Sequence, residues 1–371
     1  MTLSQLIMYK SDDYGAPVLN GLTGSLLSVL NACLVTGYGN KRPAGWLKPF
    51  SDTSSSIGPA TIGGFTLPSG SKLNLFVNDS GYPTGAAGTE ATIVGWEVLT
   101  NASGSLTGSL PASLTASLGG GAAQFPSPLF SQQLVSGANP WCATGGRLVW
   151  RKSVAATAQT RTWIVMADAY TVYLFVLTGD TAGRWMGGTF GDIFSTGGIS
   201  DKYRCHIVGR TFDNTNYTGL GGVYDNIDGF AATNWGGSWN HNLVTSMPGN
   251  IIARNQGGGQ SSVLCGKTTD LIKMSSYGNS YLMTYTGTLA TPNHPDMGYY
   301  VAPVWIVNLS NTTLRGKWRG FWVVCHPIGS FTDGQQFFGT GLHAGRKFQI
   351  FKDGPNGGFW AMEISPTVET N

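Results

Sequence analysis

Charged residues are scarce in this chain: Lys, Arg, Asp and Glu make up 11% of its 371 residues, against about 25% in a typical soluble domain. Long apolar runs are also missing, because no stretch approaches the roughly 18 consecutive apolar residues that a transmembrane helix needs. Disorder is excluded by 12 Trp, 17 Phe and 14 Tyr, since disordered chains are poor in aromatic residues. The sequence therefore predicts a folded protein without membrane insertion, whose surface is built mainly from uncharged polar residues and Gly.

Basic clusters, paired cysteines and an export signal are absent as well. The net charge is only +3, and Lys and Arg occur at most in pairs such as 41–42 and 151–152, which argues against nucleic-acid binding. The N-terminal 15 residues lack the apolar segment and cleavage site of a signal peptide. The five cysteines are widely spaced and predict buried free thiols rather than disulfides or a CxxC metal site; they are Cys33, Cys142, Cys205, Cys265 and Cys325.

One amphipathic helix is expected, over residues 24–36. Its apolar positions follow the i, i+3, i+4, i+7, i+8 pattern of a single stripe, formed by Leu26, Val29, Leu30, Cys33 and Leu34. Thr23 or Ser25 is expected to cap its first turn, and Gly37 is expected to end it. A helix this short needs a surface on which to dock.

The rest of the chain alternates apolar strand-like runs with turns rich in Gly and Asn, and it contains 54 Gly in all. This pattern predicts an all-β fold, an antiparallel β-sandwich-type architecture with one short N-terminal helix and long Gly-rich loops. Two hairpins are expected, one around the loop 167–170 and one around 353–357. Further strands are predicted near 73–77, 92–99, 203–208, 299–307 and 318–325.

A low-complexity stretch divides the chain into three parts. Residues 1–100 are predicted to form a docking helix plus a small β lobe, and 141–371 a larger sandwich-like lobe. The stretch 101–140 between them repeats Ser, Gly and Leu. It is either a flexible connection or an excursion that lays its leucines on a surface.

Several short runs together carry a resemblance that composition alone does not. The N-terminal runs are 9–17 (YKSDDYGAP), 21–27 (GLTGSLL), 34–39 (LVTGYG) and 45–50 (GWLKPF), and later ones are 149–153, 163–168, 172–175, 190–192, 203–205, 300–305 and 314–316. They resemble a family of uncharacterised virion structural proteins of tailed bacteriophages and prophages. The resemblance implies a role in the particle, with other virion proteins as partners, but it assigns no chemistry to any residue.

Tests for catalytic and metal-binding patterns give no site. Cys205-His206 and Cys325-His326 are adjacent residues on predicted strands, so each pair offers only one ligand to a given face. Loops within 211–260 mimic a calcium loop but lack its acidic residues. The strand-end acids Glu97, Asp168, Asp180 and Asp192 show no hydrolase pattern, and there is no GxSxG motif. No catalytic, cofactor-binding or metal-binding residue is predicted, and the chain is expected not to be an enzyme.

Two groups of residues are predicted to mediate contacts. Docking to other subunits is assigned to the N-terminal segment, through Leu26, Val29, Leu30, Leu34, Trp46 and Phe50. Aromatic residues in the Gly-rich stretch 211–260 form either core or interface, or a surface that binds a host glycan; they are Tyr224, Phe230, Trp235 and Trp239. We thus expect an oligomeric neck, tail or tail-fibre protein of a virion, assembled in the host cytoplasm through charge-poor interfaces. The alternatives are a capsid decoration protein and a receptor- or glycan-binding tail module.

Overall fold

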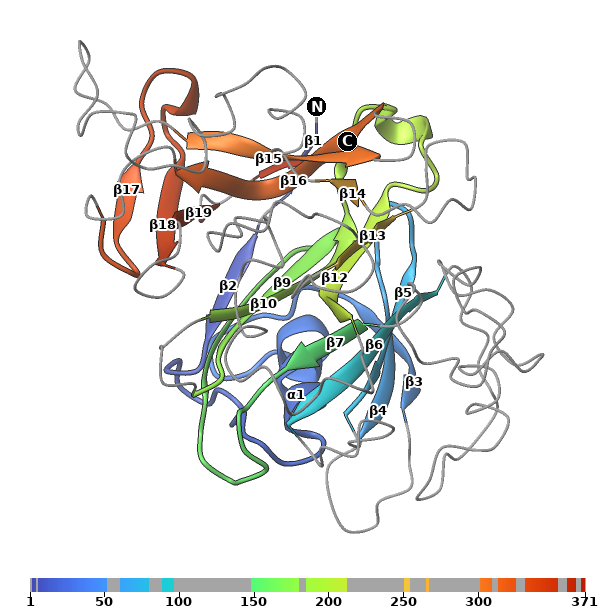
Figure 1. Cartoon of the computed structure of the whole chain (residues 1–371), viewed down its shortest axis with the longest axis vertical. Helices are drawn as coiled ribbons and strands as arrows, with labels where there is room; N and C mark the ends of the chain where they lie inside the picture. The colour runs from blue at the N-terminus through green and yellow to red at the C-terminus, as the bar shows by residue number, and fades with distance from the viewer. Residues whose placement is uncertain are drawn as a thin grey trace.

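The fold is built almost entirely from antiparallel strands, with one short helix (Figure 1), which confirms the predicted all-β class. No helix in the part of the chain that the structure describes is long and apolar enough to cross a membrane. The computed structural model describes residues 2–4, 6–51, 61–79, 89–96, 148–179, 185–211, 250–253, 265–266, 301–308, 313–324, 331–352, 359–364 and 368–370.

The larger sheet has 11 strands and consists of two halves that share strand β12. Its inner half contains β2 (Ile7–Lys10), β8 (Thr162–Ala167), β9 (Thr171–Leu177), β10 (Trp185–Asp192), β12 (Cys205–Thr211) and β13 (Asn250–Ala253). Its outer half contains β7 (Leu148–Arg151), β6 (Glu90–Trp96), β5 (Asn74–Asn78), β4 (Ile62–Thr66) and β3 (Leu47–Ser51). The first part of β12 pairs with β10 and β13, and its last two residues pair with β7.

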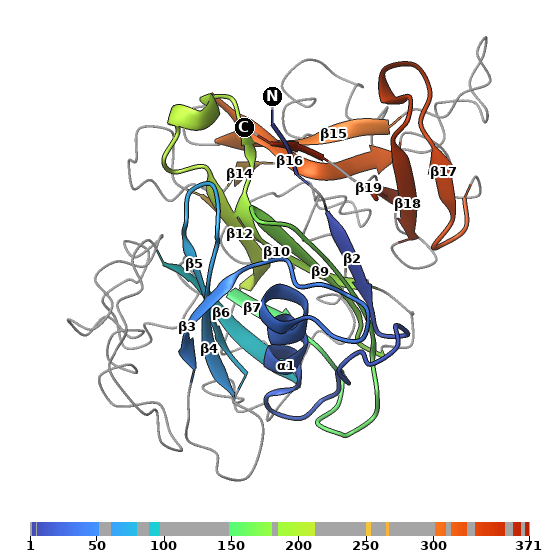
Figure 2. The same ribbon diagram turned by 180° about the vertical axis from the view of Figure 1, so that it is seen from behind.

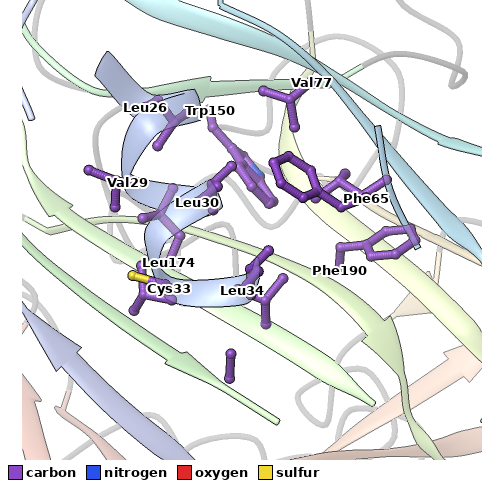
Figure 3. Packing of buried hydrophobic residues seen from close by; sticks show 14 of the residues in the cluster. Leu26, Val29, Leu30, Cys33, Leu34, Phe65, Val77, Trp150, Leu174 and Phe190 are labelled. Atoms are coloured by element: carbon purple, nitrogen blue, oxygen red, sulfur yellow. The ribbon is translucent and has the colours of Figure 1, made fainter. Parts of the chain in front are cut away.

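Helix α1 (Ser25–Asn31) and the π-helical turn η1 (Ala32–Thr36) that continues it lie between the two halves of this sheet (Figures 1 and 2). The turn ends at Gly37, as predicted, with a φ of 75° at that glycine. Figure 3 shows the apolar stripe of the helix packed into one core with residues of both halves, among them Phe65, Trp150 and Leu174. The short helix is thus stabilised by burial of its apolar stripe rather than by its own length.

A second sheet covers the other face of the inner half. It contains β14 (Cys265–Gly266), β15 (Val301–Asn308), β16 (Thr313–Val324), β19 (Phe359–Glu363), β18 (Lys347–Lys352), β17 (Gln336–Phe338) and β11 (Phe194–Ser195). Short 3-10 turns lie at η3 (Gly198–Ser200) and η5 (Gly341–His343). Tyr173 and Phe175 of the inner half pack in one cluster with Phe321 and Phe351 of the second sheet. Because both faces of β8 and β9 are buried after their first residue, the sequences from Trp163 to Ala167 and from Val172 to Leu177 are apolar or aromatic at every position instead of alternating.

Both predicted hairpins are present. Strands β8 and β9 pair from Thr162 opposite Leu177 to Ala167 opposite Val172. Strands β18 and β19 pair from Phe348 opposite Glu363 to Lys352 opposite Phe359. At the chain ends, β1 (Thr2–Ser4) and β20 (Val368–Thr370) form a separate two-stranded sheet in which Thr2 lies opposite Thr370.

The predicted lobe boundary does not separate two units of this structure. Strand β6 pairs with β7 across the stretch 97–147, and β2 pairs with β8. Residues of the predicted lobes 1–100 and 141–371 therefore share one sheet and one hydrophobic core. The change in composition near residue 101 predicts a boundary between lobes. It does not prevent strands on either side of the stretch from pairing in the same sheet. The stretch 101–140 lies outside the described residues.

Gly188 packs closely against Trp150 in this core. A Cβ atom at this position would lie 2.2 Å from Nε1 and 2.5 Å from Cδ1 of the Trp150 indole. Because Trp150 is fully buried and donates from Nε1 to the carbonyl of Val208 at 2.8 Å, the ring has no room to move. Gly188→Ala is expected to lower the free energy of unfolding by about 1–3 kcal/mol through overpacking. In a Trp150→Phe background the same substitution should cost less, and equal costs in the two backgrounds, measured by denaturant unfolding, would contradict the clash.

Candidate functional site

The most distinctive group of polar residues is a set of buried ion pairs that join the layers of the fold. Eleven of the chain's 41 charged residues are buried within the part that the structure describes. They are Asp79, Glu90, Lys152, Arg161, Asp168, Asp192, Asp201, Arg204, Arg315, Arg319 and Glu363. Charged residues are rarely buried unless they are paired, so the location of their partners matters for the fold.

Arg319 joins the second sheet to the hairpin of the inner half. Its two terminal nitrogens donate to the two carboxylate oxygens of Asp168, at 3.0 and 2.5 Å, and both side chains are 1% exposed. Asp168 also accepts the backbone N–H groups of Tyr170 and Thr171, and the Tyr170 ring lies 4.8 Å from the guanidinium carbon of Arg319. The carbonyl of Arg319 accepts the hydroxyl of Tyr173 at 2.7 Å. Such a bidentate pair fixes the orientation of the two layers as well as their contact.

Arg315, four residues earlier in β16, makes a second bridge of the same kind. Its guanidinium donates to the carboxylate of Asp201, to the hydroxyl of Ser195 and to the carbonyl of Tyr203. Asp201 lies in the turn between β11 and β12, and it also accepts the Ser195 hydroxyl. The bridge therefore fixes this turn against β16.

Asp192, at the end of β10, connects the inner half to the turn between β4 and β5. It accepts Nε of Arg204 at 2.7 Å and the backbone N–H of Ser71 at 2.9 Å, and the Ser71 hydroxyl donates to its other oxygen. Burial raises the pKa of Asp192, while Ser71 and Arg204 oppose that shift. Three Asp–Arg pairs thus lie where strands end. Two of them fix a turn against β16 of the second sheet, and the third holds the end of β10 against the start of β12 and the turn between β4 and β5.

Lys152 and Asp79 form the most deeply buried pair, with both side chains fully inaccessible. Asp79 accepts the backbone N–H groups of Leu26 and Leu27, at 2.8 and 3.3 Å, so it caps helix α1 from a distant position in the sequence. Neither Thr23 nor Ser25 supplies the predicted cap, because the capping residue is Gly24 and it makes no side-chain bond. Ser25 instead accepts from Lys152 at 3.1 Å. Burial raises the pKa of Asp79 to about 6 and lowers the pKa of Lys152, and their mutual attraction offsets each shift only in part.

His206 is a buried polar side chain of a different kind. It lies in β12, fully buried, with its ring centroid 5.9 Å from that of Trp318 in the second sheet. A backbone group of Gly191, its cross-strand neighbour, opposes the effect of burial on the pKa of His206. Neither ring nitrogen has a hydrogen-bond partner in the part of the chain that the structure describes. Burial lowers the pKa of His206 to about 3, so the imidazole is neutral in the fold.

The predicted docking residues are part of the chain's own core. Leu26, Val29, Leu30 and Leu34 are fully buried, and Figure 3 shows them facing residues of the large sheet. The Trp46 indole is also buried and donates to the carbonyl of Asp168 at 2.7 Å. The docking assignment of these five residues is therefore corrected, because the helix docks on its own sheet. Phe50 lies in β3, with its backbone opposite Gly64.

The four predicted surface-binding aromatics, Tyr224, Phe230, Trp235 and Trp239, lie outside the described residues. Of the four strand-end acids, Asp168 and Asp192 are ion-paired as above, while Glu97 and Asp180 are also outside that part. No group of three or more His, Cys, Asp or Glu side chains within the described ranges is placed to hold a metal ion.

Comparison with known proteins adds no relative. No protein-family model matches the chain, and no curated protein sequence matches it. The interpretation therefore rests on the arrangement of the chain's own residues. Chemically, that arrangement supplies buried cross-links: two Asp–Arg pairs connect β16 of the second sheet to strand-end turns, and the Asp192–Arg204 and Asp79–Lys152 pairs connect segments of the larger sheet and its helix.

Proposed function

We propose that this chain is a non-enzymatic structural subunit of a tailed-phage virion, in the neck, tail or tail fibre, that assembles through charge-poor interfaces. The observation that carries the proposal is the location of the charges. A chain with only 41 charged residues keeps at least eleven of them inside, and eight of these form four buried ion pairs. Its outer surface is therefore poorer in charge than the composition suggests, as is typical of the central part of protein interfaces.

The buried ion pairs support a structural role over a hydrolytic one. A glycoside hydrolase needs two accessible carboxyl groups about 5–10 Å apart. Asp168 and Asp192 are each 2% exposed and are bound by arginine, so neither can reach a substrate in this conformation. A fold whose layers are cross-linked at several strand ends is suited to holding its shape within an assembly.

The copy number of the chain in purified virions tests this proposal. Quantitative mass spectrometry of particles that encode the chain, relative to their major capsid protein, should find it at far fewer copies than the capsid protein. Copies approaching those of the capsid protein would point to capsid decoration instead. Absence of the chain from the particles would overturn the proposal.

A further inference from the structure

Strand β17 forms the outer edge of the second sheet (Figures 1 and 2). Its side chains at Gln336 and Phe338 are exposed, with 71% of Phe338 accessible. Leu342, in the turn that joins β17 to β18, is 96% exposed. The edge thus combines apolar side chains with a strand that pairs on one side only among the described residues.

The backbone of β17 directs a fixed set of polar groups away from the sheet. Ile350 donates its N–H to the carbonyl of Gln335, and Gly339 donates to the carbonyl of Arg346. In an antiparallel ladder, bonded pairs alternate with non-bonded ones. With Gln336 opposite Gln349 and Phe338 opposite Lys347, the N–H and C=O groups of Gln336 and Phe338 therefore point outward.

This edge lacks the side chains that normally prevent strand addition. Natural sheet edges are protected by Lys, by Pro, by bulges or by short strands. The residues of β17, Gln336, Phe337 and Phe338, include no charge and no proline, so only its length of three residues limits pairing. The nearby Lys347 belongs to the neighbouring strand β18, and its ammonium lies 5.7 Å from the centroid of the Phe338 ring.

The geometry points to a second copy of this chain as the partner of this edge: we propose that two β17 strands pair antiparallel about a two-fold axis at Phe337. In that register Gln336 of each copy lies opposite Phe338 of the other, and the outward N–H and C=O groups of both residues are satisfied. The strand carries no charge, so its copies meet without repulsion. An acidic or basic partner strand would find no complementary charge on β17 itself.

The inference deepens the proposed function, because it assigns an interface by which copies would associate in the particle. Three residues a side bury little area compared with a stable dimer. We therefore expect reversible dimers of the purified chain, with association strengthened where several copies are held together.

A charge-swap experiment on the full chain tests the register. One variant carries Gln336→Lys and Phe338→Lys, and the other carries Gln336→Glu and Phe338→Glu. Sedimentation equilibrium should show concentration-dependent dimers of the parent chain, and each variant alone should have a dissociation constant raised by about tenfold or more through like-charge repulsion. Mixing the two variants should restore dimers, because every 336–338 contact then joins Lys to Glu. Ile199→Lys, at an exposed apolar residue (78%) away from β17, should leave association unchanged.

One further variant and the mixing result keep the outcome decisive. Gln336→Pro removes one outward N–H without altering the bonds to β18, and it should also weaken the dimer. Recovery of dimers in the mixture shows that both charge variants fold. A parent chain that stays monomeric at every concentration, or dimers that tolerate the Lys and Glu variants, would overturn the inference. Virion copy number is measured separately, so a monomeric chain found in particles would contradict this interface and leave the proposed function intact.

Discussion

Replacing Lys152 by Met is expected to lower the free energy of unfolding by about 3–5 kcal/mol, because it leaves the Asp79 carboxylate buried without its partner. Asp79 and Lys152 are both fully inaccessible, and Lys152 also donates to the carbonyl of Leu22. Since Asp79 caps the first turn of α1, the substitution should also destabilise this helix and the core into which its apolar residues pack. Urea unfolding followed by tryptophan fluorescence measures the change.

The matched double variant separates loss of the pair from loss of packing. Asp79→Asn with Lys152→Met removes both charges, and the Asn oxygen can still accept the N–H of Leu26. The double variant should therefore be more stable than Lys152→Met alone, since neutral replacement of a buried pair is often tolerated. The exposed cation Lys202 is the control, and Lys202→Met should change stability by less than about 0.5 kcal/mol. If the free energy of unfolding lost in the double variant equals the sum of the losses in Asp79→Asn alone and Lys152→Met alone, Asp79 and Lys152 do not interact.

Acidification is expected to reveal two buried groups with opposite effects on stability. The pKa of His206 is about 3 in the fold and 6.5 without burial, so between these values the unfolded chain binds the extra proton. Its contribution, about 5 kcal/mol at about 1.4 kcal/mol per pKa unit, is lost as pH falls from 6.5 to 3. Asp79 has the reverse order, about 6 in the fold against 3.8. Its titration therefore lowers stability as pH rises from 3.8 to 6, by about 3 kcal/mol.

Because these two pH ranges overlap and the two effects have opposite signs, they should largely cancel in the stability of the parent chain. His206→Gln should be less sensitive to acid than the parent, so that its stability relative to the parent rises as pH falls from 6.5. The Asp79→Asn, Lys152→Met variant should show the opposite trend, losing stability relative to the parent as pH falls from 6. Urea unfolding at several pH values between 3 and 7 measures both differences. A difference between His206→Gln and the parent that is constant over this range would be incompatible with a buried neutral imidazole.

The local patterns of the sequence predicted the secondary structure well, and for a physical reason. The stripe from Leu26 to Leu34 and the apolar runs of β8 and β9 depend only on neighbouring residues, whose periodicity is visible in the sequence. The same stripe could not identify its own docking surface. An amphipathic helix must bury its apolar side, but whether it does so on its own sheet or on another subunit is decided by contacts far along the chain.

The ion pairs between layers were beyond sequence analysis for the same reason. Asp168 and Asp192 stood out as acids at strand ends, but their partners Arg319 and Arg204 are assigned only by the fold. Asp79 gave no signal at all, since a single acid at the end of a strand resembles any turn residue. One clue was present in β16, where Arg315, Lys317 and Arg319 alternate in a strand that also contains Trp318 and Phe321. Arginines beside such large aromatic residues in a strand indicate buried carboxylate partners.

The pairing of the two chain ends has a mechanical consequence. Thr2 lies opposite Thr370 in the β1–β20 pair. A force that pulls these two residues apart would therefore break the hydrogen bonds of this small sheet one after another. Little tension is needed to separate strands in that direction. A label attached beside Thr2 would also lie next to one attached beside Thr370.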